Sequence, residues 1–288
     1  MHMAASAVAP RFAPPISLSL PLGIFFAVFV IAPMILLAFV SLHNDTAMTQ
    51  TGIGQYAKFL TDGFNLGILG NTLGLGLKVT VLSLLLGFPL AYLYTQTPHR
   101  WQGPLLLLIV LPLLTSSVVR TFAWVVILGR QGIVNTALLD LDLIAEPIKL
   151  LYTPGAVAIA LAQIELPLMV LPLITALMNI DTNLRQASLA LGAGHWRTFV
   201  HVTLPLSMPG LLTGALLVFA SSVSAFVTQT LVGGGQQMFM PYYMYQQAIQ
   251  ANNYPFAAAI AMLLLVCVLA AVVAVNALGR RNRGFIHV

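Results

Sequence analysis

Six apolar stretches, each about 25 residues long, alternate with shorter polar segments along the chain. Their approximate bounds are 18–42, 69–94, 104–128, 154–178, 208–231 and 255–278. The hydrocarbon core of a bilayer is about 30 Å thick, and about 20 helical residues cross it. The stretches lack the strict alternation of barrel strands, and a helix satisfies its backbone hydrogen bonds within the segment. The pattern therefore predicts an all-α, polytopic membrane protein with about six transmembrane helices.

Composition supports a membrane protein and argues against a soluble domain. Hydrophobic residues make up 59% of the chain and charged residues only 7%, and the mean hydropathy is +0.94. The surface of a soluble domain needs roughly 25% charged residues. We expect a single transmembrane domain over residues 18–279, with a tail at 1–17 and another at 280–288.

The basic residues predict the orientation of the helices. With the N-terminus in the cytoplasm, most arginines lie on the cytoplasmic side of the membrane, as the positive-inside rule requires. The cytoplasmic set is Arg11, Arg100, Arg185, Arg197, Arg280, Arg281 and Arg283, and the outer set is Lys58, Arg130 and Lys149. Both termini are therefore predicted to be cytoplasmic. The pI near 9.6 follows from this distribution, and nucleic acid is not an expected partner.

The longest predicted cytoplasmic loop, residues 181–207, carries a helical pattern that glycines interrupt. Apolar residues recur at helical spacing before the glycines and again after them. Gly192 and Gly194 permit a sharp turn between the two parts. We expect Pro205 and Pro209 to re-aim the chain into the fifth transmembrane helix, because proline is tolerated best near a helix start. The pattern predicts a helix, a turn and a second helix.

This loop contains a motif with a specific spacing. In its general form the motif reads E-A-A, then three residues, G, nine residues, I or V, one residue, and L-P. This loop keeps the spacing and differs at two of the first three positions. The matching positions are Gln186, Ala187, Ser188, Gly192, Val202, Leu204 and Pro205. In this respect the chain resembles the permease subunits of ABC importers. The resemblance implies that the loop is a coupling helix seated in a groove of a separate ATP-binding subunit. Gln186 replaces the usual glutamate, which removes a charge, and Ser188 replaces an alanine.

Further segments are similar to the spermidine/putrescine-type branch of these permeases. They are Asn71-Thr72, 87–92, 119–124, 226–228 and 231–234. Residues 253–257 are similar to a D-W-P-F-G pattern of that branch, but the acid and the tryptophan are missing. The resemblance implies a bacterial inner-membrane subunit for a small solute, with a polyamine-like cation favoured.

The same resemblance implies the partners. They are a pair of ATP-binding subunits, a second permease subunit in a heterodimer, and an extracytoplasmic solute-binding protein. ATP and Mg²⁺ are expected on the partner ATPase, and no cofactor is expected on this chain. An amide-rich outer segment without lysine or arginine is a candidate surface for the binding protein, and simple solvation explains it equally well. Its amide residues are Gln236, Gln237, Gln246, Gln247, Gln250, Asn252 and Asn253.

The sequence does not predict an enzyme. It contains no G-x-x-x-x-G-K-[ST] run for nucleotide phosphates, and Gly233-Gly234-Gly235 is followed by glutamines with no lysine. His195 and His201 are six residues apart, which suits neither the i, i+4 zinc pair nor a denser ligand cluster, so no metal site is expected.

Polar residues inside the apolar stretches are the candidate pathway residues, because a charge in hydrocarbon costs about 3 kcal/mol or more unless it is paired or hydrated. Arg120 and Glu165 fall at similar depths on the third and fourth predicted helices. They either form a buried pair that fixes the two helices, which we favour, or Glu165 faces a wet pathway and meets a cationic solute. Asn71 is a further candidate because of the family pattern.

The fifth apolar stretch adds three hydroxyl residues to this set. Ser221, Ser224 and Thr228 are spaced i, i+3 and i+7, which places them on one face of one helix. Such residues bond local carbonyls or pack against another helix about as often as they line a pathway. Two other functions remain open, an ion-gradient-driven transporter with Glu165 as proton carrier and a membrane scaffold without transport.

Overall fold

The computed structural model describes residues 16–282, which are helical apart from loops, turns and one isolated bridge between His43 and Thr51. Six helices in the described part are long and apolar enough to cross a membrane, as predicted. Their bounds are Pro21–Ser41, Gly63–Gln96, Ser117–Asp140, Pro154–Met178, His195–Ser224 and Tyr254–Ala277. Residues 1–15 and 283–288, which make up most of the two predicted tails, lie outside the described residues.

Each span is built from one or more helical elements. The first span is α1 (Ile16–Phe26), the π-helix η1 (Ala27–Ile31) and α2 (Ala32–Ser41), and the last is α14 (Tyr254–Asn282). Between them, in chain order, are α3 (Gly54–Thr61), α4 (Gly63–Gln96), α5 (His99–Val110), the 3-10 helix η2 (Leu111–Leu114), α6 (Ser117–Leu128), α7 (Ile133–Asp140), α8 (Pro154–Met178), α9 (Thr182–Ala190), α10 (His195–Thr198), the π-helix η3 (Phe199–Thr203), α11 (Leu204–Ser224), α12 (Phe226–Gly233), α13 (Met240–Tyr245) and the π-helix η4 (Gln246–Gln250).

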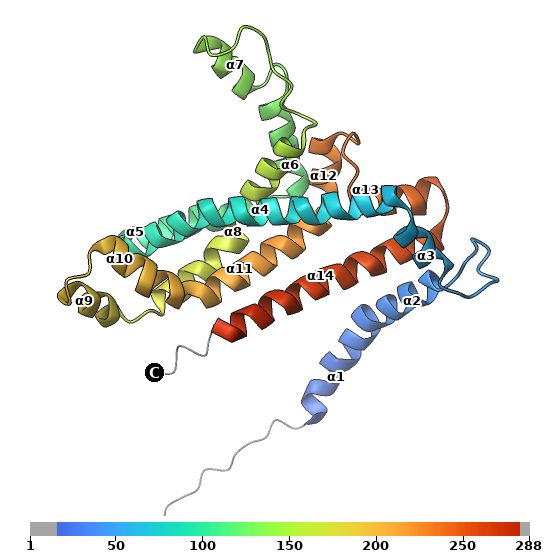
Figure 1. The fold of residues 1–288 in the computed structure, drawn as a ribbon, viewed down its shortest axis with the longest axis horizontal. Coiled ribbons are helices and arrows are strands. Elements are labelled where there is room, and N and C mark those ends of the chain that lie inside the picture. Colours follow the sequence, from blue (N-terminus) through green and yellow to red (C-terminus); the bar gives the residue numbers. More distant parts are fainter. Residues whose placement is uncertain (1–15, 283–288) are drawn as a thin grey trace, which may run out of the picture.

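Three long helices, α4, α8 and α11, pack against one another and form the core (Figure 1). Helix α8 contacts both of the others and is the most buried of the six spans. Small residues allow this close packing. A Cβ on Gly210 of α11 would lie 2.5 Å from the carbonyl oxygen of Pro172 on α8, so only glycine fits at that crossing.

The first span lies at the edge of the bundle, where α2 packs against α14 and α1 diverges from it (Figure 1). None of its 18-residue apolar window is buried within the chain. Its large side chains face outward, Phe29 and Leu36 among them. This surface meets lipid or another subunit, because no other part of the described chain covers it.

The prediction of one continuous third helix over residues 104–128 is wrong. The chain instead forms α5 and η2, takes extended backbone at Thr115 and Ser116, and starts again as α6. Pro112 within η2 has no amide hydrogen to donate to the preceding turn, and the Thr115 hydroxyl donates to its carbonyl at 2.8 Å. The segment 117–140, through α6 and α7, provides the third candidate span.

The fifth predicted helix, 208–231, is interrupted at Ala225, where φ is −73° and ψ is +71°. The helix α11 ends there and α12 begins at Phe226. The buried side chain of Gln229 makes the interruption tolerable, because its Nε2 donates to the Ser222 carbonyl at 2.8 Å and the Val223 carbonyl at 3.4 Å. A polar side chain thus replaces part of the helical hydrogen bonding that the break removes.

Candidate functional site

The predicted helix, turn and helix of the 181–207 segment are present as α9, a turn and α10. The Asp181 carboxylate caps α9 by accepting from the Asn183 amide at 2.9 Å. At the other end, the Gly192 amide donates to the Leu189 carbonyl and the Ala193 amide to the Ser188 carbonyl. This is a Schellman cap, and Gly192 takes the left-handed conformation that it requires, with φ of +83°.

The second half of this segment differs from the prediction, because the chain does not leave the helix at Pro205. Helix α10 continues through η3 into α11 and forms one uninterrupted span from His195 to Ser224. The π-helix accommodates the proline. The Leu204 amide bonds the Phe199 carbonyl five residues back, which shifts the hydrogen-bond pattern just before Pro205, a residue with no amide hydrogen to donate.

An aromatic cluster joins the segment to α4. The Phe199 ring lies edge-on to Phe88 and Tyr92 of α4, with centroids 5.5 and 5.7 Å away, and stacks on Trp196 at 5.6 Å. The Arg185 guanidinium lies over the Tyr92 ring at 5.9 Å. We call these five residues the aromatic cluster. They fix the orientation of α9 and α10 relative to one of the three core helices.

The turn of the segment presents large apolar side chains to the outside. Leu191 is 89% exposed and Trp196 is 76% exposed. Gln186, Ala187 and Pro205 of the predicted motif are also exposed, whereas Ser188, Val202 and Leu204 are half-buried. The Ser188 hydroxyl lies 2.9 Å from the Thr198 hydroxyl and ties α9 to α10. The segment is thus internally fixed and has an uncovered apolar tip.

A polar cavity of about 490 Å³ lies where α6, α8, α11 and α12 meet. Five of the six predicted pathway residues line it, namely Arg120, Glu165, Ser221, Ser224 and Thr228. The sixth, Asn71, is exposed on α4 and does not line this cavity. The prediction that Ser221, Ser224 and Thr228 share one helix is wrong, since the break at Ala225 places Thr228 on α12, but the break still brings all three to the same cavity.

Arg120 and Glu165 are neighbours in the cavity without forming a direct ion pair. Arg120 Nη1 donates to the carbonyl of Ile164 at 3.1 Å, one residue before Glu165. The Arg120 Nε atom is buried and has no hydrogen-bond partner. Within residues 16–282 no nitrogen of Arg120 lies within 4.0 Å of a Glu165 oxygen. Arg120 and Glu165 therefore line the same cavity, whereas the buried bridge that we favoured is not formed in this structure.

Two polar residues near the cavity were not among the predicted pathway residues. Thr121 is fully buried on α6, and its hydroxyl lies 2.8 Å from that of Thr228 on α12. Gln229 is the residue that stabilises the break at Ala225. The sequence could have indicated both, because a glutamine or a hydroxyl residue within a predicted membrane span needs a hydrogen-bond partner inside the protein.

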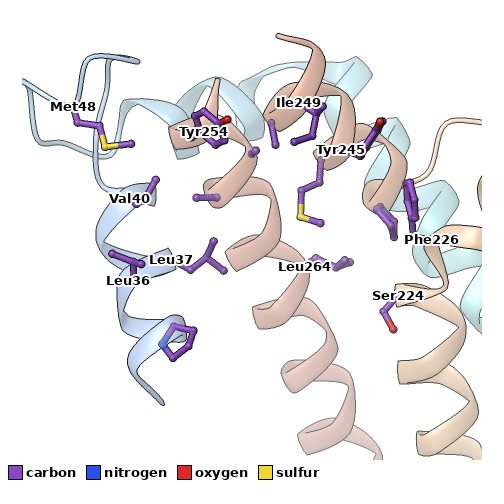
Figure 2. A pocket seen from close by; sticks show the side chains of 16 residues that line it. Leu36, Leu37, Val40, Met48, Ser224, Phe226, Tyr245, Ile249, Tyr254 and Leu264 are labelled. Atoms are coloured by element: carbon purple, nitrogen blue, oxygen red, sulfur yellow. The ribbon is translucent and has the colours of Figure 1, made fainter. Parts of the chain in front are cut away.

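A second, apolar groove of about 680 Å³ lies between α2, α14 and the α13–η4 region. Figure 2 shows Leu36, Leu37 and Val40 of α2 on one side and Tyr245 and Ile249 on the other. No charged residue lines the groove, although it shares Ser224 and Phe226 with the polar cavity. The polar cavity is therefore the candidate site for a charged solute.

A comparison with protein families identifies the class of this fold and site. Residues 16–284 match the model of the binding-protein-dependent transport system inner membrane component. The chain belongs to this family. It is a permease subunit of an ABC importer and a multi-pass protein of the bacterial inner membrane. In this family the permease is the membrane subunit, and the ATPase is a separate subunit.

Curated relatives of the permease include several polyamine permeases. It is 33% identical over 246 residues to the spermidine/putrescine transport system permease protein PotB of Haemophilus influenzae, covering 83% of this chain and 84% of the relative. It is also 33% identical to PotB of Escherichia coli, with coverages of 74% and 78%. The molybdenum transport system permease protein ModB of Escherichia coli is 34% identical over 178 residues, which cover 59% of this chain and 76% of ModB.

Solved structures agree with the permease fold. One chain from a bacterial ABC transporter involved in the import of the acidic polysaccharide alginate superimposes with a TM-score of 0.74. The identity is 21%, and the alignment covers 92% of this chain and 94% of the other. A second structure of a bacterial alginate ABC transporter, in complex with an alginate pentasaccharide-bound periplasmic protein, gives a TM-score of 0.73 at 20% identity, covering 92% and 93% of the two chains. This similarity establishes the fold only.

Proposed function

We propose that this permease forms part of the pathway for a small cationic solute of the polyamine type, which a solute-binding protein delivers. A second, different permease subunit completes the pathway. The 181–207 segment couples the two permeases to a pair of ATP-binding subunits, which bind ATP and Mg²⁺. Closure of the ATP-loaded subunits moves the segment and opens the pathway alternately to the two sides of the membrane.

The observation that carries the coupling role is the fixed, apolar tip of the 181–207 segment. Leu191 and Trp196 are almost fully exposed beside a Schellman cap that holds their backbone in one shape. Two large apolar side chains at one turn favour a protein partner over water. The motif from Gln186 to Pro205 lies on the same segment, and its usual glutamate is absent, so contact with the partner depends on shape and apolar area more than on an ion pair.

Two observations support a polyamine-like solute. The PotB relatives, which are 33% identical over more than two thirds of this chain, are named as spermidine/putrescine permeases. The polar cavity contains the Glu165 carboxylate and several hydroxyl groups, which suit an ammonium group. The similarity to ModB is shorter, and it does not reach two thirds of the chain.

The coupling role is tested by placing a charge on the tip. We expect Leu191→Glu to leave the permease inserted in the membrane but to reduce co-purification of the ATP-binding subunits, because the charge would be desolvated at the contact. Ile53→Glu is the matched control, since Ile53 is 70% exposed in the 42–53 segment at the other end of the bundle. Equal recovery of the ATP-binding subunits with both variants would contradict the coupling role.

The cargo and the energy source are tested together in proteoliposomes that contain both permeases, the ATP-binding subunits and the solute-binding protein. We expect uptake of radiolabelled putrescine or spermidine only when ATP is enclosed on the side of the ATP-binding subunits. Uptake that follows an ion gradient without ATP would favour a secondary transporter. A complex that hydrolyses ATP and moves no solute would favour a scaffold.

A further inference from the structure

We propose that Glu165 binds an ammonium group of the solute in the polar cavity, and that Arg120 competes with the solute for this carboxylate. The inference rests on the proposed polyamine-like cargo and adds a defined site to it. The site lies inside the membrane span, separate from the pocket of the solute-binding protein.

The first step concerns the state of Glu165. Its side chain lies on α8 in the centre of the core, is 8% exposed, and faces the cavity. The Ser221 hydroxyl faces this carboxylate as a hydrogen-bond partner, and no ion pair within 4.0 Å reaches it from the described residues. A buried carboxylate with no cation paired to it is costly, and one hydroxyl offsets only part of that cost, so this position favours a cation that enters the cavity.

The second step concerns Arg120, which is the nearby candidate for such a cation. Its guanidinium is always charged and is held at the carbonyl next to Glu165 by the 3.1 Å bond from Nη1. Its Nε is buried without a partner, so part of its hydrogen-bonding capacity is unused. Because Glu165 is the next residue along α8, a change of the Arg120 rotamer would turn this group from the Ile164 carbonyl toward the carboxylate. The cavity thus contains its own competitor, which keeps binding weak and lets the solute leave.

The third step concerns the groups that surround the ammonium. An ammonium has three donors, and Glu165 does not use all of them. Ser117, Ser221 and Ser224 line the cavity and carry hydroxyl groups that can accept from an ammonium. The first turn of α12 also lines the cavity, and its amides disfavour a cation. Selection for a cation therefore rests mainly on the Glu165 carboxylate.

The test measures putrescine binding to the complex of both permeases and the ATP-binding subunits, without the solute-binding protein. The variants are Glu165→Gln, Arg120→Gln and the double variant, with Glu146→Gln as control because Glu146 is an exposed carboxylate far from the cavity residues in sequence. We expect Glu165→Gln to raise the Kd about tenfold or more, as for the loss of a hydrogen bond to a charged group. We expect Arg120→Gln to lower the Kd about threefold or more by removing a neighbouring like charge. The double variant should bind like Glu165→Gln.

Effects of opposite sign separate competition from a structural pair. If Glu165→Gln and Arg120→Gln both raise the Kd and both lower thermal stability, the residues form a structural pair and the inference is wrong. Unchanged binding in Glu165→Gln, with wild-type thermal stability, also overturns it. In either case, putrescine uptake by the wild-type system would leave the proposed cargo intact. Absence of diamine transport in the wild-type system would remove the cargo and the site together.

Discussion

Gly192 sets the shape of the 181–207 segment through its backbone. Its φ of +83° lies in the left-handed region, and no atom lies within 4 Å of where a Cβ would stand. The constraint is therefore conformational and does not come from crowding. A β-branched residue strains this conformation by about 1–2 kcal/mol, whereas asparagine tolerates it better.

We therefore expect Gly192→Val to lower solute-stimulated ATP hydrolysis and transport strongly, and Gly192→Asn to retain most of both. The measurement is ATP hydrolysis and uptake in the same proteoliposome preparation. Equal activity of the two variants would mean that the left-handed cap does not matter for coupling.

Asp45 gives the outer segment 42–53 a pH dependence. Its carboxylate accepts from the Thr49 hydroxyl at 2.7 Å and from the amides of Thr49 and Gln50, which lowers its pKa from 3.8 to about 2. A lowered pKa means that the charged form stabilises the fold of this segment. The contribution is complete above about pH 4 and is lost as the pH falls toward 2.

We expect hydrogen exchange in the 42–53 segment, corrected for the intrinsic pH dependence, to stay slow down to about pH 4 and to accelerate below it. Asp45→Ala should show the fast exchange already at neutral pH. A protected segment in that variant would show that the hydrogen bonds of Asp45 do not hold the turn.

At the scale of elements, α4 is one continuous helix between the two ends of the bundle. Phe88 and Tyr92 contact Phe199 near one end, and the Thr72 hydroxyl accepts from the Met240 amide of α13 toward the other end at 2.9 Å. Figure 1 shows α9 and α10 at one end of α4 and α13 at the opposite end. Helix α4 thus connects the 181–207 segment with the outer helices without a break.

We expect Phe199→Ala to weaken this connection, so that ATP hydrolysis continues while the number of solute molecules moved per ATP falls. Loss of a well-packed Phe side chain costs about 3–5 kcal/mol, and less where the ring is half-buried as here. Phe29→Ala is the control, because Phe29 is exposed on η1. A normal ratio of transport to hydrolysis in Phe199→Ala would argue against the aromatic cluster as the connection.

The hydrophobic pattern predicted those helices whose ends are marked by a capping residue or a proline. The fourth helix was expected at 154–178 and is found there, with Thr153 capping it and a proline at its first position. The breaks at Thr115–Ser116 and at Ala225 were not predicted, because each 25-residue window is apolar enough on average for one span, and the hydroxyl residues beside each break are also tolerated within a membrane helix. The second break depends on a bond from Gln229 to a carbonyl seven residues back, which the hydrophobic pattern does not reveal.

Part of the candidate site could also be predicted from the sequence. A charged or hydroxyl residue in lipid is rare enough to be noticed, so Arg120, Glu165 and Ser221 were selected as candidate pathway residues, and all three line one cavity in the structure. Which partner each group takes depends on rotamers and on the break at Ala225. The bond from Arg120 to the Ile164 carbonyl therefore became visible only in the structure.

At the scale of the whole molecule, the structure places two sets of segments at opposite ends of the bundle. The start of α5 and the 181–207 segment lie at one end, and α3, α13 and η4 lie at the other (Figure 1). The basic residues predict that the first end is cytoplasmic. The solute-binding protein then has access to the end with η4, and the ATP-binding subunits to the end with Leu191.

Cysteine labelling in intact cells tests this orientation. In a Cys267→Ser background, which removes the only native cysteine, we expect Gln247→Cys to react with an impermeant thiol reagent and His99→Cys to be shielded until the membrane is opened. Both positions belong to the described part of the chain, on η4 and at the start of α5, and His99 is exposed, so shielding would come from the membrane and not from burial. Arg283→Cys, beyond the described residues, should be shielded like His99→Cys.

Labelling of position 99 from outside, with protection of position 247, would show that the orientation is the reverse of the predicted one. The Leu191 tip would then face away from ATP, and coupling through the 181–207 segment would be physically impossible.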